Sequence, residues 1–214
     1  MTTIEAPVKK FLSIEEIIGR LSSLTFNLQQ DTKDIVQLNP IERLKSINKV
    51  WDACKSKVGS PQLALDVGTG FGYGTVFLES QGIKTIGIEN VGKKIKQGQD
   101  LFSRVKVNIP RFAKLDFSQH PAFYEGDINS ISNTIQADLI TVFYLSLGMI
   151  SEAETFKTLQ KLLKKDGKVL LATEASVEEV RAFFEHHTIP VSFSYEVVKV
   201  PDNFEKTAII LRFE

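Results

Sequence analysis

The chain has little cysteine, no net charge and no long apolar run, and each shortage excludes a class of protein. A single cysteine among 214 residues excludes an internal disulfide and fits a reducing compartment. Lysine plus arginine equal aspartate plus glutamate, at 26 each, so the net charge indicates neither a nucleic-acid partner nor an acidic lipid surface. No run is long enough to span a bilayer, and the first ten residues have no apolar signal core. We therefore expect a soluble, cytoplasmic protein without a membrane partner.

The order of the predicted elements indicates the fold class. Five apolar stretches alternate with helical patterns, and two alternating stretches close the chain around a turn. This order predicts an α/β fold with a doubly wound, seven-stranded, mainly parallel sheet and a C-terminal antiparallel hairpin. The predicted strands are Leu63–Val67, Lys84–Glu89, Ala122–Glu125, Ala137–Phe143, Lys168–Thr173, Val191–Val200 and Lys206–Phe213.

The pattern of the first sixty residues predicts a helical cap. Ser13 and Glu16 form a capping-box pattern ahead of apolar residues at helical spacing. Pro40 suits the first position of a second helix, whose apolar face runs from Ile41 to about Lys57. We therefore expect a tail and cap over residues 1–60 and one larger domain over residues 61–214. Further helices are expected from about 76–81, 91–105, Ser151 to Asp166–Gly167, and Ser176 to His187.

The most informative stretch runs from Leu63 to Gly74. A short buried strand holding Asp66 breaks into alternating glycines at positions 68, 70, 72 and 74, and a helix pattern follows. Glycine allows sharp turns and close approach of a ligand to the backbone, and a helix start presents free N–H groups. The stretch therefore predicts a ligand-binding turn.

Acidic residues also follow the next two predicted strands. Glu89 ends the second strand, and Asp127 lies in Gly126-Asp127-Ile128 after the third. Because open α/β sheets bind ligands at the carboxyl ends of their strands, we expect these acids to lie around one site. A nicotinamide dehydrogenase is excluded, because Gly-x-Gly-x-x-Gly fails at Tyr73 and at Thr75.

The acid, the three alternating glycines and the two later acids together resemble class I S-adenosylmethionine-dependent methyltransferases. The resemblance covers roughly residues 63–214 and implies S-adenosyl-L-methionine as cofactor. The cofactor-binding residues that it implies are Asp66, Gly68, Thr69, Gly70, Gly72, Glu89, Asn90, Asp127, Ile128 and Phe143. Asn90 has an alternative interpretation as a helix cap.

The chemistry of this ligand gives each acid a role. The ligand carries an ammonium group, a carboxylate, a ribose diol and an adenine. Asp66 offers a negative charge near the ammonium, and Glu89 can accept from both ribose hydroxyls. Asp127 can accept from the adenine amino group, while the N–H of Ile128 can donate to a ring nitrogen.

The sequence gives less information about the methyl acceptor. The best candidate for a residue near the acceptor is Tyr144, which follows the fourth predicted strand. We expect Tyr144 as the catalytic residue that lines the acceptor tunnel, and packing between helices is its alternative role. No Pro-Pro, Pro-Cys or magnesium-binding motif of other subclasses occurs, so no metal is expected. Gly87-Ile-Glu89 with Phe143-Tyr144 loosely resembles non-SET protein-lysine methyltransferases, which favours a protein lysine or other amine.

Other functions stay open at this point. A small-molecule or RNA acceptor is the alternative among enzymes, and a non-catalytic binding module is the alternative of another class. The lysines from Lys93 to Lys96 could contact nucleic acid or an acidic partner, but a solvated helix face is the favoured interpretation. The acceptor therefore stays unknown, without a strong nucleic-acid signature.

Overall fold

The fold is known from a computed structural model, which describes residues 12–28, 39–107, 122–125, 135–144, 147, 153–189, 191–203 and 206–214. Its centre is a seven-stranded sheet in the order β3-β2-β1-β4-β5-β7-β6. The strands are β1 (Leu63–Val67), β2 (Lys84–Glu89), β3 (Ala122–Glu125), β4 (Ala137–Val142), β5 (Leu163–Thr173), β6 (Phe193–Lys199) and β7 (Thr207–Phe213). The first five run parallel, and β7 pairs antiparallel with both β5 and β6.

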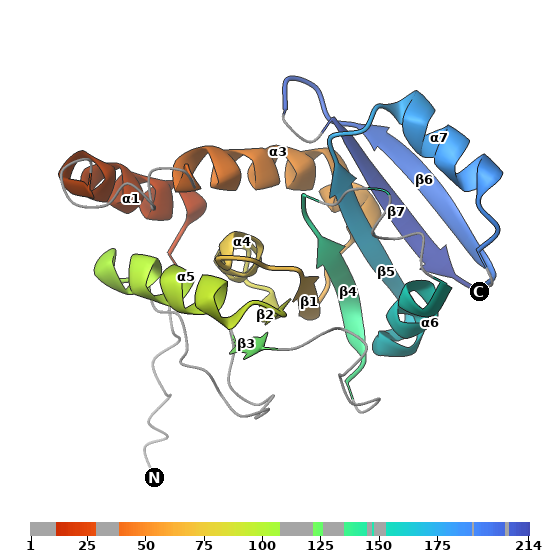
Figure 1. Cartoon of the computed structure of the whole chain (residues 1–214), viewed down its shortest axis with the longest axis horizontal. Coiled ribbons are helices and arrows are strands. Elements are labelled where there is room, and N and C mark those ends of the chain that lie inside the picture. Colours follow the sequence, from red (N-terminus) through yellow and green to blue (C-terminus); the bar gives the residue numbers. More distant parts are fainter. Residues whose placement is uncertain are drawn as a thin grey trace, which may run out of the picture.

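Helices cover both faces of this sheet (Figure 1). One face carries α1 (Ile14–Leu28), α3 (Pro40–Val58), α4 (Tyr73–Ser80) and α5 (Gly92–Arg104), and the other carries α6 (Ala153–Leu162) and α7 (Val177–His186). The α/β class and the mixed sheet predicted from the sequence are confirmed.

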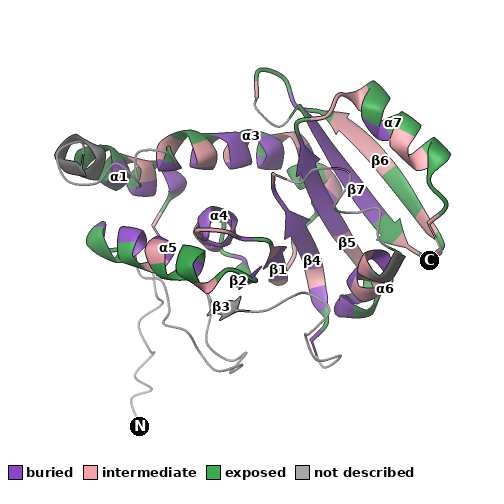
Figure 2. Cartoon of the chain, viewed as in Figure 1, coloured by how far each residue is buried: buried purple, intermediate pink, exposed green. Residues whose placement is uncertain are grey.

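Alternation along the central strands creates two separate apolar cores. On β5, Leu170 packs with the helices of the first face, whereas Val169 and Leu171 pack with those of the second. Successive strand residues point to opposite faces, so one continuous apolar run serves both cores. The strands between the helical layers are accordingly the most buried elements (Figure 2).

The N-terminal helices share the first core with the sheet. Trp51 of α3 meets Phe77 of α4 edge to face, with ring centroids 6.2 Å apart. Arg20 of α1 donates to the carbonyls of Val105 and Lys106 at the end of α5, at 3.3 and 2.9 Å. Cationic side chains stabilise the carbonyl end of a helix, so Arg20 ties α1 to α5.

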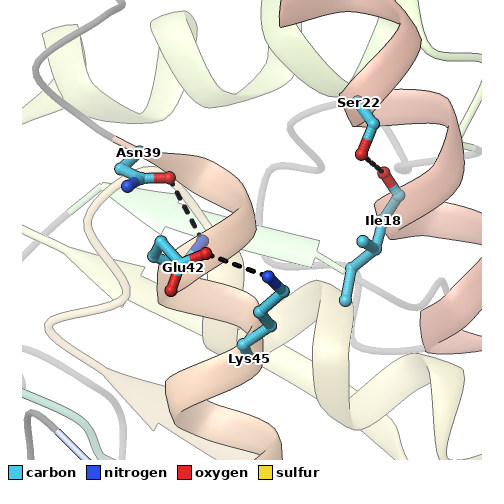
Figure 3. A network of polar contacts seen from close by, with 5 residues as sticks. All are labelled: Ile18, Ser22, Asn39, Glu42 and Lys45. Atoms are coloured by element: carbon cyan, nitrogen blue, oxygen red, sulfur yellow. Dashed lines mark hydrogen bonds and ion pairs between the residues drawn. The ribbon is translucent and has the colours of Figure 1, made fainter.

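Both N-terminal helices begin with side-chain caps. Ser13 and Glu16 form the predicted reciprocal capping box of α1, at 2.8 and 3.2 Å. In α3, the Glu42 N–H donates to the Asn39 carboxamide oxygen at 3.3 Å, and Lys45 pairs with Glu42 at 3.0 Å (Figure 3). Nearby in α1, the Ser22 hydroxyl bonds the Ile18 carbonyl. The contacts of Glu42 with Asn39 and Lys45 stabilise the first turn of α3.

Two predicted boundaries were wrong. Helix α4 begins at Tyr73 rather than near position 76, because Gly72 takes a left-handed conformation and serves as its N-cap. Helix α6 ends at Leu162, and β5 begins at Leu163 rather than Lys168. The register between β4 and β5 shifts across this segment, so the expected terminator at Asp166–Gly167 lies within a strand irregularity.

Candidate active site

The turn after β1 is built from glycines that take left-handed backbone conformations. Gly68, Gly70 and Gly72 have φ of 67°, 59° and 87°, values that residues with a Cβ rarely adopt. The Thr69 N–H donates to the Ile88 carbonyl at 3.0 Å, which ties the turn to β2. Three of the predicted glycines are therefore required by backbone geometry.

Gly74 is required for a steric reason, because a side chain at this position would clash with its neighbours. A Cβ on this residue would lie 2.6 and 2.7 Å from the Asp66 carboxylate oxygens and 2.8 Å from Phe143 Cδ2. Such distances are far below van der Waals contact. The absent side chain lets the first turn of α4 pack directly against the end of β1.

Asp66 is buried beneath the turn, with 1% of its surface exposed. Its carboxylate accepts hydrogen bonds from the hydroxyls of Thr75 at 3.0 Å and Thr141 at 2.9 Å. Burial raises the pKa of Asp66, and these threonine hydroxyls, with that of Thr69, oppose the rise. Asp66 thus joins β1, α4 and β4 through hydroxyl groups.

Thr69 belongs to the same network. Its side-chain oxygen lies 2.8 Å from that of Thr75, and Thr69 is buried. Sequence reasoning predicted Thr69 as a site residue but missed Thr75 and Thr141. The signal for Thr141 was a hydroxyl in the otherwise apolar strand β4, next to β1 in the sheet.

Glu89 connects the ends of β1 and β2. One carboxylate oxygen accepts from the Gly70 N–H at 2.8 Å, and the other accepts from the Val91 N–H at 3.1 Å. Glu89 is buried, whereas Asn90 beside it is exposed. Since Val91 is the N-cap of α5 and no side chain caps it, the alternative role of Asn90 as a helix cap was wrong.

Helix α5 also touches the turn, through a residue that sequence reasoning missed. Gly98 is buried, and a Cβ there would lie 2.0 Å from the Phe71 carbonyl oxygen. The available signal was its place on the apolar face, three residues from both Ile95 and Leu101. Helix α5 therefore rests against the backbone of the turn.

Phe143 and Tyr144 follow β4 at the same edge of the sheet. Phe143 is 7% exposed and packs in the first core, against Gly74. Tyr144 has a left-handed φ of 62°, an unfavourable value for an aromatic residue. Its hydroxyl donates to the Arg43 carbonyl at 3.0 Å, and the Arg43 guanidinium carbon lies 3.9 Å from the ring centroid.

Two predicted site residues, Asp127 and Ile128, lie outside the described residues. Within the described ranges, no three histidine, cysteine, aspartate or glutamate side chains gather as a metal site. His186 and His187 lie at the end of α7, on the opposite face of the sheet from the turn. Among the described helices none has the length and apolarity needed to cross a bilayer.

No protein-family model and no curated protein sequence matches the chain. Solved structures do match. A ribosomal protein L11 methylase from Lactobacillus delbrueckii subsp. bulgaricus has a TM-score of 0.57 at 11% identity, covering 79% of each chain. The 16S rRNA methylase RmtB has a TM-score of 0.56 at 16% identity, covering 96% of this chain and 77% of its own.

A third similar structure holds a ligand. The glycopeptide N-methyltransferase MtfA in complex with sinefungin has a TM-score of 0.51 at 10% identity, covering 78% of this chain and 92% of its own. At such identities the likeness shows the fold alone, an α/β fold shared with these three methylase and methyltransferase structures.

Proposed function

We propose that the protein is an S-adenosylmethionine-dependent methyltransferase. The observation that carries the proposal is the pairing of Glu89 with Gly70 across the ends of β2 and β1. Each Glu89 oxygen holds one backbone N–H, and a carboxylate oxygen has two lone-pair sites. One acceptor site therefore stays on each oxygen for the two hydroxyls of a ribose.

The glycine turn fits the rest of that ligand. Gly68 is exposed, and among described atoms nothing lies within 4 Å of the position that a Cβ would take. This open backbone suits the amino-acid end of the donor. Asp66 supplies negative charge beneath it, and we keep Asp127 and Ile128 as the proposed adenine contacts.

When bound, the cofactor supplies an electrophilic methyl group on a sulfonium. The protein's part is to hold the acceptor in line and exclude water. We propose that the ring of Tyr144 orients the acceptor and excludes water. Its hydroxyl is already occupied, because it donates to the Arg43 carbonyl. Its left-handed backbone supports a functional role, since strained residues cluster at active sites.

The N-terminal region completes the proposal. We propose residues 1–60 as a helical cap on a methyltransferase domain at 61–214, with α1 and α3 at the acceptor entrance. A protein lysine or other amine is the favoured acceptor, and a small molecule or RNA is the alternative. The similar structures named above carry protein, RNA and glycopeptide in their names, so they do not favour one class.

Binding of S-adenosylmethionine, measured by calorimetry, tests the donor. We expect Glu89→Ala to weaken binding at least tenfold, because a buried acceptor of two hydroxyls is lost. Asp138→Asn is the matched control, since that carboxylate binds the N–H groups of Gln62 and Leu63, where β1 begins. A protein that binds no cofactor at millimolar concentration would refute the assignment.

Transfer of a tritiated methyl group to a fractionated cell extract tests the activity. Label in protein, RNA or small molecules identifies the acceptor class. Tight cofactor binding with no label in any fraction would favour the alternative of a non-catalytic binding module.

A further inference from the structure

The proposed donor carries an α-carboxylate to which no residue has been assigned. Its ribose, ammonium and adenine are assigned to Glu89, Asp66 and Asp127. A carboxylate is best held by donors that carry positive charge or a rigid fork of N–H groups, as arginine does. A partner for it is therefore expected among cationic side chains beside the glycine turn.

Arg43 brings a guanidinium to this edge of the sheet. It lies in the first turn of α3, and its guanidinium carbon is 3.9 Å from the ring centroid of Tyr144, which follows the carboxyl end of β4. The Tyr144 hydroxyl donates to the carbonyl of Arg43 itself. One aromatic residue thus holds both the backbone and the side chain of Arg43, which fixes the direction of the fork.

Tyr73 adds a second donor. It is the first residue of α4, directly after Gly72, and only 6% of its surface is exposed. Its hydroxyl has no hydrogen-bond partner among the described residues. A buried phenol without a partner is costly, so such a group invites a ligand acceptor.

The charges of Arg43 and Tyr144 both influence the pKa of Tyr73. Burial raises the pKa of the Tyr73 phenol, the positive charge of Arg43 opposes the rise, and Tyr144 adds to it. Arg43 and Tyr144 therefore both act on the Tyr73 hydroxyl. The edge of Tyr73 meets Phe102 of α5, with centroids 5.8 Å apart, which restricts the ring.

We propose that the Arg43 guanidinium and the Tyr73 hydroxyl form the subsite for the α-carboxylate of the methyl donor. This inference rests on the proposed function and names a subsite within it. It also gives the left-handed conformation of Tyr144 a purpose, because that conformation places the ring under Arg43. Tyr144 is then a positioning residue for the donor as well as a wall for the acceptor.

The test compares S-adenosylmethionine with decarboxylated S-adenosylmethionine, which keeps the sulfonium and the ammonium, by calorimetry. We expect wild type to prefer the carboxylate form about 10- to 100-fold, the range for charge-assisted hydrogen bonds. Arg43→Gln should reduce this preference to near one by weakening only the carboxylate form. Tyr73→Phe should reduce it by a smaller factor, and Arg43→Lys should retain part of it.

The outcomes separate the subsite from the donor assignment. If wild type binds both ligands equally, the subsite is wrong while the donor assignment stands, and if it binds neither, the proposed function fails. An Arg43→Gln protein that loses affinity for both ligands equally also overturns the subsite, since the arginine is then structural. Arg20→Gln is the control, because that arginine binds carbonyls at the end of α5 and should leave the preference unchanged.

Discussion

The α carbon of Gly98 lies so close to the carbonyl of Phe71 that a Cβ on residue 98 would be 2.0 Å from that oxygen. The Phe71 carbonyl carbon and α carbon would also lie within 3.0 Å. Because these are backbone atoms, a rotamer change cannot relieve the contact. Helix α5 therefore defines where the glycine turn can lie.

Gly98→Ala should consequently destabilise the protein. Alanine gains about 1 kcal/mol of helix propensity over glycine, but overpacking against backbone costs about 1–3 kcal/mol and displaces the turn. We expect a lower midpoint in urea and weaker cofactor binding. Gly19→Ala in α1 is the matched control, because no described atom lies within 4 Å of the position that a Cβ would take there. This substitution should stabilise the protein.

Thr141→Val should destabilise the protein in a pH-dependent manner. The Thr141 hydroxyl donates to Asp66, whose pKa burial raises above its ordinary 3.8. The relevant pH range lies between the ordinary pKa of 3.8 and the raised pKa of Asp66 in the folded protein. In this range the folded state binds more protons than the unfolded state, so the contribution of Asp66 to the free energy of unfolding falls as pH rises. Loss of a hydroxyl donor raises the pKa further and widens this range.

We therefore expect Thr141→Val to cost about 1–3 kcal/mol at pH 7, as for an unsatisfied buried acceptor, and less at pH 4, where the carboxyl is closer to neutral. Urea unfolding at several pH values measures this. Thr85→Val serves as control, because its hydroxyl bonds the Ile83 carbonyl and its cost should not vary with pH. An equal pH profile for both variants would contradict the assignment to Asp66.

Cys54 should resist alkylation in the folded protein. Its side chain is fully buried in α3, and burial raises its pKa to about 11, with Lys57 lowering and Glu196 raising it. The thiolate is the reactive form, so reaction at pH 8 requires unfolding. Mass spectrometry after iodoacetamide should find Cys54 unmodified in buffer and fully modified in urea, and rapid labelling in buffer would contradict its burial.

Tyr144→Phe separates the hydroxyl of this residue from its ring. The variant keeps the ring under Arg43 and loses the hydrogen bond to the Arg43 carbonyl, so we expect a loss of about 1 kcal/mol in unfolding free energy. Tyr195→Phe, at a residue 39% exposed on β6, should change it by less than about 0.5 kcal/mol. If Tyr144→Phe is as stable as wild type but transfers methyl groups slowly, the hydroxyl acts on the acceptor instead.

Local patterns in the sequence determined the order of the elements and the positions of Asp66 and Glu89 at strand ends. Both depend on short-range rules, since strand alternation, capping and glycine turns are decided within a few residues. The capping box at Ser13 and Glu16, predicted from spacing alone, is formed in the structure. These rules located the glycine turn without any knowledge of packing.

Only the tertiary structure decided which groups surround that turn. The donors to Asp66 come from α4 and β4, the Tyr144 hydroxyl reaches Arg43 across 101 positions, and Gly98 meets Phe71 from another helix. Such contacts depend on how layers pack rather than on neighbouring residues. The sequence alone therefore led to the proposed methyl donor, whereas the arrangement of Arg43, Tyr73 and Tyr144 depends on how α3 packs on the sheet.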